Sequence, residues 1–546
     1  MKILIEILGV LHCLGSVWGQ GLEFYVSNDS GSDSWDGTSE TNVDGSDVGP
    51  WRTLSHAIHQ VRQIRPDPPT ASDKVTISML PGRYFLSTPL DMDERDSYIT
   101  IRALYEEETS ISGGVVLDGD WSEEEGGVRT TTFEGSCGEA FVGSLRLVPA
   151  RSPNTNKAID YNMNIAHPSY HTIKDLLVET ADCTRNATGN QDDCPDENRL
   201  GFVYKDEFDP NWEHLQQTKI LVFHSWVAEY AKVQNLTEEN GVSKVFFEKE
   251  LQKAPIGTYI ASGWRYIIYN NKAILDIPGE YVCVDNGDDT STFSYIHPDM
   301  PELEEISVVM SQLTQTVVLN QVNNVRLQGI KFEHSSSNGV DGYPQGDEAA
   351  LRIVSSQHVV VEDCQFSSTG MVGMYVVDSS NVHVTKSVFT DIGGHGLMVH
   401  YDDFDMVGLT YDVTVDNNLF DGCGISSFWQ CHCIQMGGES NMTVRSNEVT
   451  NVPNSAIAIR GLMHGADYWE DNGVTDPTRD DYIFHVEYNK IYNYGLGILT
   501  DFGGVMLSES CLTGEIIHHI INMKPIHNRP QRKWPLDGLL PTRLGT

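Results

Sequence analysis

Four polar residues occupy matching places in short apolar segments of the C-terminal half, where together they could do chemistry. They are His400, Gln435, Arg460 and Asp501, and their segments read LMVH, CIQM, IAIR and ILTD. If these segments are stacked strands, side chains alternate between two faces and the four polar ones share one outward column. A column with an imidazole, an amide, a guanidinium and a carboxylate suits a sugar chain, so we expect the first three to bind substrate.

Asp501 is the strongest catalytic candidate in this column. Two glycines, Gly503 and Gly504, follow it and would let a ligand approach the backbone closely. Cleavage of a glycosidic bond ordinarily needs two carboxyl groups about 5–9.5 Å apart, one to protonate the leaving oxygen and one to act as nucleophile or base. The alternative is that Asp501 forms only a cross-strand ion pair with Arg460.

Candidates for a second carboxylate lie in the acidic stretch before the last repeat. Residues 461–481 bring several acids beside the outward column, and the catalytic candidates among them are Glu470, Asp471 and Asp480. Trp469 precedes them, and an aromatic face of this kind stacks on sugar rings. Packing of this loop onto the strands explains Trp469 equally well.

A repeat predicts the elements that position these residues. Six segments share an aliphatic residue followed five positions later by a second apolar residue, namely Leu327/Phe332, Val361/Phe366, Val384/Phe389, Val415/Phe420, Val444/Val449 and Val486/Ile491. The second member recurs at intervals of 34, 23, 31, 29 and 42 residues. A floor of 23 with a variable excess is typical of a solenoid with loops inserted at its turns. We therefore predict an all-β, right-handed parallel β-helix in which the six second members stack in one internal column.

The turns of the last three coils carry a second repeated feature. Asn418, Asn447 and Asn489 each stand two positions before the second apolar member of their coil. Stacked amides at such a place can satisfy the backbone groups of successive turns. The sequence thus predicts an asparagine ladder along the axis.

The rest of the chain divides by its patterning. Leu54, Ala57, Ile58, Val61 and Ile64 recur at helical spacing, so we expect a helix that covers the open end of the solenoid. Residues 20–114 then form this cap and the first coils. From 115 to 301 the period is lost, which favours an inserted β-rich domain. The main β-helix follows at 302–515, and 516–546 is an irregular tail, rich in proline and basic residues.

The first residues indicate export. Lys2 precedes an apolar run, and the small residues Val17 and Gly19 fit a cleavage site, so residues 1–19 are expected to be a signal peptide and the protein to be secreted. A membrane anchor is the competing interpretation, but the run is too short to span a bilayer. Four sequons fit a secreted glycoprotein, at Asn28, Asn186, Asn235 and Asn441.

Cysteine spacing points to disulfides and buried thiols. Cys183 and Cys194 bracket a polar loop and are the pair that we expect to be bridged. Cys423, Cys431 and Cys433 crowd into one coil without a second ligand pair at zinc-site spacing. A local disulfide or buried thiols therefore fit them better than a metal.

The formal charge of −41 restricts the partners. It argues against nucleic acid and against unassisted binding of polyanionic polysaccharides, and it leaves neutral or weakly acidic glycans as substrate. We expect a monomer with no cofactor. Asp285, Asp288 and Asp289 form a small acidic turn that could hold Ca²⁺, although a solvated turn explains it better because no full oxygen-ligand loop follows.

Several longer segments resemble one enzyme family. The opening YVSNDSGSDSWDGTSE…GPWRTLSHAI is typical of secreted polysaccharide-active β-helix proteins, and three further segments, Arg146–Asn154, Tyr269–Tyr281 and Tyr488–Val505, are similar to glycoside hydrolase family 141. The resemblance runs from Phe24 to about Leu507. It implies a parallel β-helix and hydrolysis of plant-type or algal glycosides, including α-L-fucosides and xylan. The chain departs from the family pattern at 461–481, which is longer and more acidic and leaves the second carboxylate open.

Three functions remain open. The first is a glycoside hydrolase that uses paired carboxylates. The second is a non-catalytic extracellular protein that binds glycans or acts structurally. The third is a polysaccharide lyase or epimerase, whose chemistry wants lysine, arginine or tyrosine beside a neutralised acid. The net charge and the scarcity of lysine in the outward column count against the third.

Overall fold

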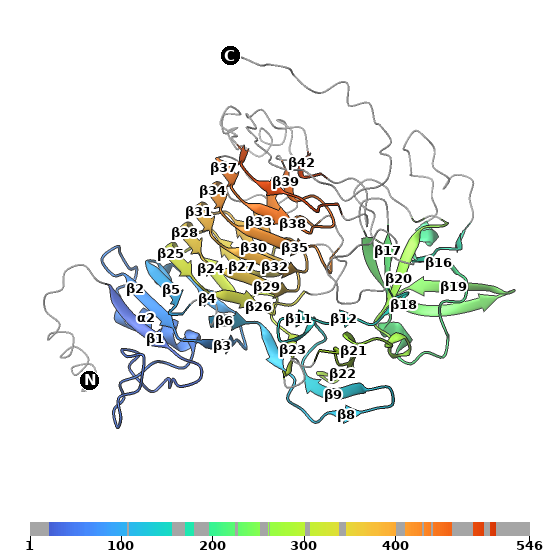
Figure 1. Ribbon diagram of the computed structural model, residues 1–546, viewed down its shortest axis with the longest axis horizontal. Coiled ribbons are helices and arrows are strands. Elements are labelled where there is room, and N and C mark those ends of the chain that lie inside the picture. The colour runs from blue at the N-terminus through green and yellow to red at the C-terminus, as the bar shows by residue number, and fades with distance from the viewer. Residues whose placement is uncertain are drawn as a thin grey trace, which may run out of the picture.

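The computed structural model describes residues 21–105, 109–154, 170–178, 196–223, 228–251, 260, 262–300, 306–337, 346–399, 410–427, 431–437, 441–460, 484–495 and 503–508. Its body is a stack of coils that contribute short strands to three parallel sheets, and from β2 onward each coil gives one strand to each sheet (Figure 1). Sheet A contains β1 (Leu22–Val26), β2 (Val75–Met79), β5 (Ile99–Ala103), β25 (Asn323–Gln328), β28 (Gln357–Glu362), β31 (Ser380–Thr385), β34 (Tyr411–Asp416), β37 (Met442–Arg445) and β40 (Phe484–Glu487).

The other two parallel sheets repeat this order, so every coil runs from sheet A to sheet B to sheet C. Sheet B contains β3 (Gly82–Phe85), β6 (Thr109–Ser112), β26 (Lys331–Glu333), β29 (Gln365–Thr369), β32 (Val388–Ile392), β35 (Leu419–Cys423), β38 (Glu448–Thr450) and β41 (Lys490–Ile491). Sheet C contains β4 (Leu90–Met92), β24 (Val317–Asn320), β27 (Ala349–Val354), β30 (Val372–Val377), β33 (Leu397–Val399), β36 (Ile434–Met436), β39 (Ile457–Arg460) and β42 (Val505–Ser508).

The predicted internal column exists. Phe332, Phe366, Phe389, Phe420, Val449 and Ile491 are each paired with the next along sheet B. The four phenylalanine rings stack face to face, with centroids 4.9, 4.6 and 4.4 Å apart. All six side chains are fully buried. Identical flat rings can repeat at the strand spacing without a void, which fixes the register of each coil on the next.

The predicted asparagine ladder is also confirmed, at the corner between sheets A and B. The residue before each ladder position takes a left-handed conformation, as at Asn417, Ser446 and Tyr488. Asn418 Nδ2 donates to Asn447 Oδ1, and Asn447 Nδ2 donates to Asn489 Oδ1, both at 3.0 Å. The same two oxygens accept the backbone N–H of Asn418 and Asn447. The buried turn backbone is thereby satisfied without water.

Helix α2 (Leu54–Ile64) covers the N-terminal end of the stack (Figure 1). Thr53 caps its first turn, and Leu54, Ala57, Ile58 and Val61 join the core formed by the first coils. Ile64, which the helical spacing placed on the same face, is instead 42% exposed, because the helix ends there. Short 3-10 helices occur at η1 (Glu94–Asp96), η3 (Asp196–Arg199), η4 (Leu215–Gln217) and η5 (Lys272–Ile274).

Between β6 and β24 the strands are mostly antiparallel and form three further sheets beside the coils (Figure 1). One sheet has β7 (Gly114–Val116), β10 (Ala140–Val142), β11 (Leu145–Arg146) and β23 (Val308–Ser311). A second has β8 (Ser122–Glu123), β9 (Val128–Glu134), β12 (Val148–Pro149), β21 (Glu280–Asp285) and β22 (Thr290–Ile296). The third has β13 (Arg151–Ser152), β14 (His171–Thr172), β15 (Asp175–Leu176), β16 (Gly201–Tyr204), β17 (Lys219–Phe223), β18 (Ala228–Glu239), β19 (Val242–Phe247) and β20 (Arg265–Tyr269).

Cysteines stabilise this inserted part in a way that the sequence did not reveal. A disulfide joins Cys137 to Cys283, whose Cα atoms are 5.7 Å apart. The predicted partners Cys183 and Cys194 lie outside the described residues. Cys423, Cys431 and Cys433 are buried and form no disulfide. Of the two alternatives for this group, buried thiols are therefore confirmed and a local disulfide is not. In the described part of the chain, no helix is long and apolar enough to cross a membrane.

The stacked column predicts a large effect of Phe389→Ala. Removing one ring takes away contacts with Phe366 and Phe420 and leaves a cavity, so the free energy of unfolding should fall by about 3–5 kcal/mol. Val388→Ala in the same strand, at a half-buried outward position, should cost less than about 1 kcal/mol. Urea denaturation measures both, and equal losses would contradict the column.

A buried carboxylate in the inserted part predicts a pH dependence of stability. Glu280 is fully buried, and burial raises its pKa to about 7. Folding therefore favours its neutral form, so its contribution is complete below pH 4.5 and is lost as the pH rises through about 7. We expect Glu280→Gln to remove a fall on the order of 3 kcal/mol between pH 5 and 8. Denaturation profiles at both pH values test this, and Glu238→Gln on the exposed end of β18 is the control.

Candidate functional site

The register of sheet C corrects the predicted outward column. Gln435 pairs with Met398 and Ala458, and Met398 pairs with Tyr375, so Gln435 does not share a column with His400 and Arg460. Arg460 pairs with Ser508, because the last strand begins at Val505 and not within the segment that ends at Asp501. A one-residue slip moves a side chain to the other face of a strand, and aligning short apolar segments by eye cannot detect such a slip.

Most other predicted site residues lie outside the described residues, namely His400, Trp469, Glu470, Asp471, Asp480 and Asp501. Arg460 closes β39. Chain order still separates the carboxylate candidates into two groups. Asp501 belongs to the connection from β41 in sheet B to β42 in sheet C, whereas the other acids belong to the connection from β39 in sheet C to β40 in sheet A.

A polar column does exist, at the corner where sheet B passes into sheet C. His395, His432, Ser455 and Gly503 occupy equivalent positions in four successive coils, two residues before the first paired residue of each sheet C strand. Their backbones are linked from coil to coil, through Gly396 N to His432 O at 3.3 Å and Ala456 N to Gly503 O at 3.3 Å. We call these four residues the corner column. It ends two residues beyond Asp501.

The imidazoles of the corner column are held in defined orientations. Nδ1 of His395 lies 3.0 Å from the backbone nitrogen of His432 and 3.2 Å from the carbonyl oxygen of the same residue, so the ring is held against the His432 backbone. Nδ1 of His432 lies 3.3 Å from the carbonyl oxygen of Ser455, to which it can only donate. The Ser455 hydroxyl then accepts the backbone N–H of Gly503 at 3.0 Å. The backbone that follows Asp501 is therefore fixed against the corner column.

Gln435 lies next to this column on the outward face of sheet C. Its side chain is 1% exposed, and in the described part of the chain its Nε2 has no hydrogen-bond partner. Tyr375, Met398 and Ala458, which share its position in neighbouring coils, are buried as well. A buried amide without a partner costs free energy, and such groups occur where a ligand completes the bonding. The prediction that Gln435 binds substrate is compatible with this environment.

The inserted part packs over the same corner. The Tyr230 hydroxyl donates to the carbonyl oxygen of Ser426, which lies in the same connection as His432. Arg146 is buried, pairs with Asp391 at 2.9 Å and donates to the carbonyl oxygens of Thr369 and Asp391. These contacts hold the antiparallel sheets against sheet B strands β29 and β32 and against the connection from sheet B to sheet C that contains Ser426. The inserted part therefore flanks the corner between sheets B and C on the side away from the coils.

Glu139 is a carboxylate in this junction that no pattern in the sequence singles out. Its oxygens accept the hydroxyls of Ser311 and Ser337, both at 2.8 Å. Gly370 lies against it, and a Cβ there would come within 2.8 Å of Glu139 Oε2. From the coil that follows Ser337 to the coil of Gly503, sheet C advances by five strand spacings of about 4.8 Å each. Glu139 is therefore too distant to form a catalytic pair with a group beside Gly503.

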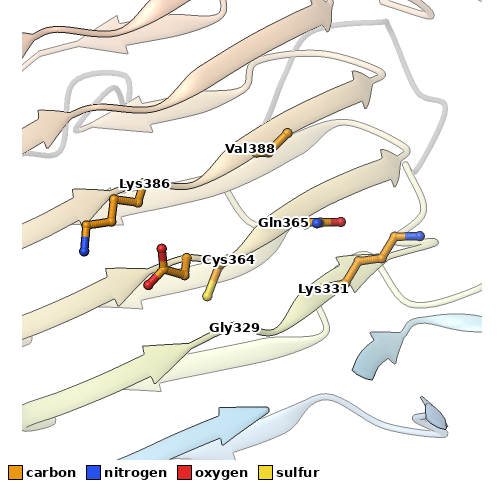
Figure 2. A pocket seen from close by; sticks show the side chains of 7 residues that line it. Gly329, Lys331, Cys364, Gln365, Lys386 and Val388 are labelled. Carbon is orange, nitrogen blue, oxygen red and sulfur yellow. The ribbon is translucent and has the colours of Figure 1, made fainter. Parts of the chain in front are cut away.

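A second hollow lies at the opposite corner, between sheets A and B. It has a volume of about 180 Å³ and is lined by Lys331, Gln365 and Lys386 among others, with the two lysine side chains extending to opposite sides (Figure 2). Lys331 is 2.7 Å from Glu333, and Lys386 is 2.8 Å from Glu362. Because both charges are already paired, this hollow is a weaker ligand site than the corner column.

The residues considered for metals and glycans have other partners. Asp285 and Asp288 accept hydrogen bonds within their own turn, from Gly287 and Thr290. Within the described ranges, no group of three or more His, Cys, Asp or Glu side chains is placed to hold a metal ion.

The structure also describes three of the four predicted glycosylation sites. Among the sequons, Asn235 and Asn441 are exposed and Asn28 is half-buried. Asn441 donates through Nδ2 to Asp412, and Asn28 through Nδ2 to Arg83 O at 2.8 Å. Asn186 lies outside the described residues.

Known proteins share this fold. A family model described as a right handed beta helix region matches residues 306–467. A solved structure titled "Glycoside hydrolase" has a TM-score of 0.71 and 18% identity, and the match covers 89% of this chain and 85% of that one. The complex of XylC with xylose has a TM-score of 0.45 and 9% identity, covering 87% and 62%. No curated protein matches this chain.

The family model and the likeness to the structure titled "Glycoside hydrolase" support the fold alone. Together with the three parallel sheets they confirm the predicted right-handed parallel β-helix, including its capping helix and the β-rich insertion. The 85% coverage of the glycoside hydrolase means that the likeness extends well beyond the coils.

The unpaired amide predicts opposite effects of Gln435→Met on folding and binding. Methionine has nearly the same shape and removes a buried donor that lacks a partner, so the melting temperature should stay the same or rise. Affinity for a bound glycan should fall at least about tenfold, because one or two hydrogen bonds are lost. Thermal unfolding and calorimetric titration measure the two effects. A clear loss of stability with unchanged affinity would make Gln435 structural.

Proposed function

We propose that this protein is a secreted glycoside hydrolase that acts on neutral or weakly acidic polysaccharide glycans. Its active centre lies at the corner between sheets B and C in the last coils, beneath the inserted part. The glycoside hydrolase likeness and the resemblance to family 141 support this class of enzyme. The latter adds α-L-fucosides and xylan as the glycosides to test first.

One observation carries the proposal. The hydrogen bond from Gly503 N to the Ser455 hydroxyl fixes the backbone two residues after Asp501 against a column with two oriented imidazoles. Gln435 adds an unpaired amide next to this column. Polar groups with fixed orientations around a carboxylate are what a glycosidase needs to hold a sugar ring at a reacting acid.

In the proposed reaction, one carboxyl group protonates the glycosidic oxygen as the bond to the anomeric carbon breaks. A second carboxylate attacks that carbon or activates the water that does so, and water ends as the new hydroxyl on the anomeric carbon. Asp501 supplies one of these groups, and Glu470, Asp471 and Asp480 are the candidates for the other. His400, Gln435, Arg460 and Trp469 contact the sugar.

The N-terminal run supports export, and secretion places the enzyme where extracellular glycans occur. Asn235, which is exposed, is the better glycan acceptor of the sequons that the structure describes, because Asn441 already donates through its Nδ2 to Asp412. At Asn28 a glycan would have to replace the bond from its Nδ2 to Arg83. No cofactor takes part in the proposed reaction.

A panel of aryl glycosides and polysaccharides tests the function, with Asp501→Asn as the decisive variant. We expect new reducing ends without ultraviolet absorbance, and a loss of several orders of magnitude in kcat for Asp501→Asn at an unchanged melting temperature. The substitution keeps the shape and removes only the charge and the capacity for proton transfer. Asp378→Asn is the matched control, because Asp378 stands in a left-handed corner at the other end of sheet C, where asparagine is equally well tolerated.

Each other outcome selects a different function. Unsaturated products would indicate a lyase, and binding without turnover would indicate a glycan-binding module. Normal turnover of Asp501→Asn would move the catalytic role to the three acids before the last coil. Unfolding of Asp501→Asn but not of Asp378→Asn would make Asp501 a structural residue.

A further inference from the structure

One face of the third inserted sheet is turned toward the coils and carries two lysines that oppose each other. Leu221, Phe223, Ala228, Ile267 and Tyr269 form the apolar cluster of this face, with Tyr230 packed against it. Alternation along β17 and β18 places Lys219 and Lys232 on the same face. In the antiparallel register Lys219 stands directly opposite Lys232. The bond from Tyr230 to Ser426 shows that this face looks onto the connections between sheets B and C.

The charges of these lysines are not paired. Among the described residues neither amine has a hydrogen bond or ion pair, although the chain has 77 acidic residues against 36 basic ones. Like charges directly opposite each other in a sheet are destabilising, with Cβ atoms about 5 Å apart. Lys219 is half-buried, and burial followed by the charge of Lys232 lowers the pKa of its amine. Placing the two lysines opposite each other therefore lowers the stability of the folded protein when no anion is bound.

The nearest acid does not neutralise the pair. Glu139 lies close enough to act on Lys219 through its charge, but both carboxylate oxygens are already bonded to Ser311 and Ser337. A separate anion placed between the two amines would relieve their repulsion and gain two charge-assisted hydrogen bonds. Tyr269, opposite Lys219 on the neighbouring strand, and Tyr230 provide ring surface beside the amines.

We propose that Lys219 and Lys232 form a subsite for an anionic sugar unit, with a ring carboxylate or a sulfate ester held between the two amines. The subsite rests on the proposed function, because Tyr230 on the same face contacts Ser426 in the connection that leads to His432 of the corner column. It deepens that function, because the substrate would be a glycan that is mostly neutral and carries anionic units at intervals. The overall charge of −41 would reject a uniformly anionic polymer.

Calorimetric titration of the full chain tests the subsite without turnover. The ligands are trigalacturonate, a sulfated carrageenan oligosaccharide and neutral xylotriose, and the variant is Lys219→Met/Lys232→Met, which keeps the apolar stems. We expect an anionic ligand to bind the wild type at least about tenfold more tightly than it binds the variant, with xylotriose unchanged. Added salt should weaken the binding of the anionic ligand to the wild type but not to the variant. Whichever anionic ligand responds identifies the carboxylate or the sulfate.

Lys244→Met is the matched control, since Lys244 lies on β19 of the same sheet beside Glu239 at 3.8 Å. It should bind all three ligands as the wild type does. The double variant should melt at the same temperature as the wild type or higher, because a repulsion is removed. Equal binding of anionic ligands by the wild type and the double variant would overturn the subsite, and so would a wild type that does not prefer them.

The outcomes separate this inference from the proposed function. Hydrolysis together with lysine-independent binding would leave the glycosidase and remove the subsite. Absence of hydrolysis together with lysine-dependent binding would leave the subsite on a glycan-binding protein.

Discussion

The stacking of each coil on an identical position of the next is the interaction on which the rest of the structure depends. Along Phe332, Phe366, Phe389 and Phe420 it is ring on ring, and along Asn418, Asn447 and Asn489 it is amide on amide. Both contacts repeat at the strand spacing, so they stabilise one strand register and disfavour registers shifted by a residue. Once sheets A and B are fixed in this way, each coil delivers its remaining residues to sheet C and to the corner before it.

The difference between sheets A and B, which fix the register, and sheet C explains how much of the structure the sequence could predict. The repeated pairs and the asparagines lie in sheets A and B, where strands are joined by turns of constant length, and their columns were predicted correctly. The connections from sheet B to sheet C vary from residues 370–371 in one coil to 492–504 in the last. The register cannot be read from the sequence across a connection of variable length, and Gln435 was therefore assigned to the wrong column. Asp501 lies outside the described residues. The Cys137–Cys283 disulfide and Glu139 depend on contacts between distant segments, which no local pattern encodes.

The same variability places chemistry at the corner between sheets B and C. A connection that changes length from coil to coil can take up new side chains without disturbing the stack, whereas the strands cannot. The inserted part contacts one of these connections through Tyr230 on Ser426, and the neighbouring sheet B strands through Arg146 on Thr369 and Asp391. It brings a second surface with its own charges to the corner. The repeating coils therefore have one region, the connections between sheets B and C, in which length and side chains differ from coil to coil.

The outward face of sheet C shows why the polar groups gather at the corner rather than along the strands. Tyr375, Met398 and Ala458 are buried there, so this face behaves as a second apolar layer and not as an open polar surface. Gln435 is the exception among them, and its unpaired amide lies next to His432 and Ser455, where the polar column runs. A buried polar group persists at the edge of an apolar layer only if something compensates its desolvation. Among the described residues its Nε2 has no partner, and in the function that we propose a sugar hydroxyl would supply the missing hydrogen bond.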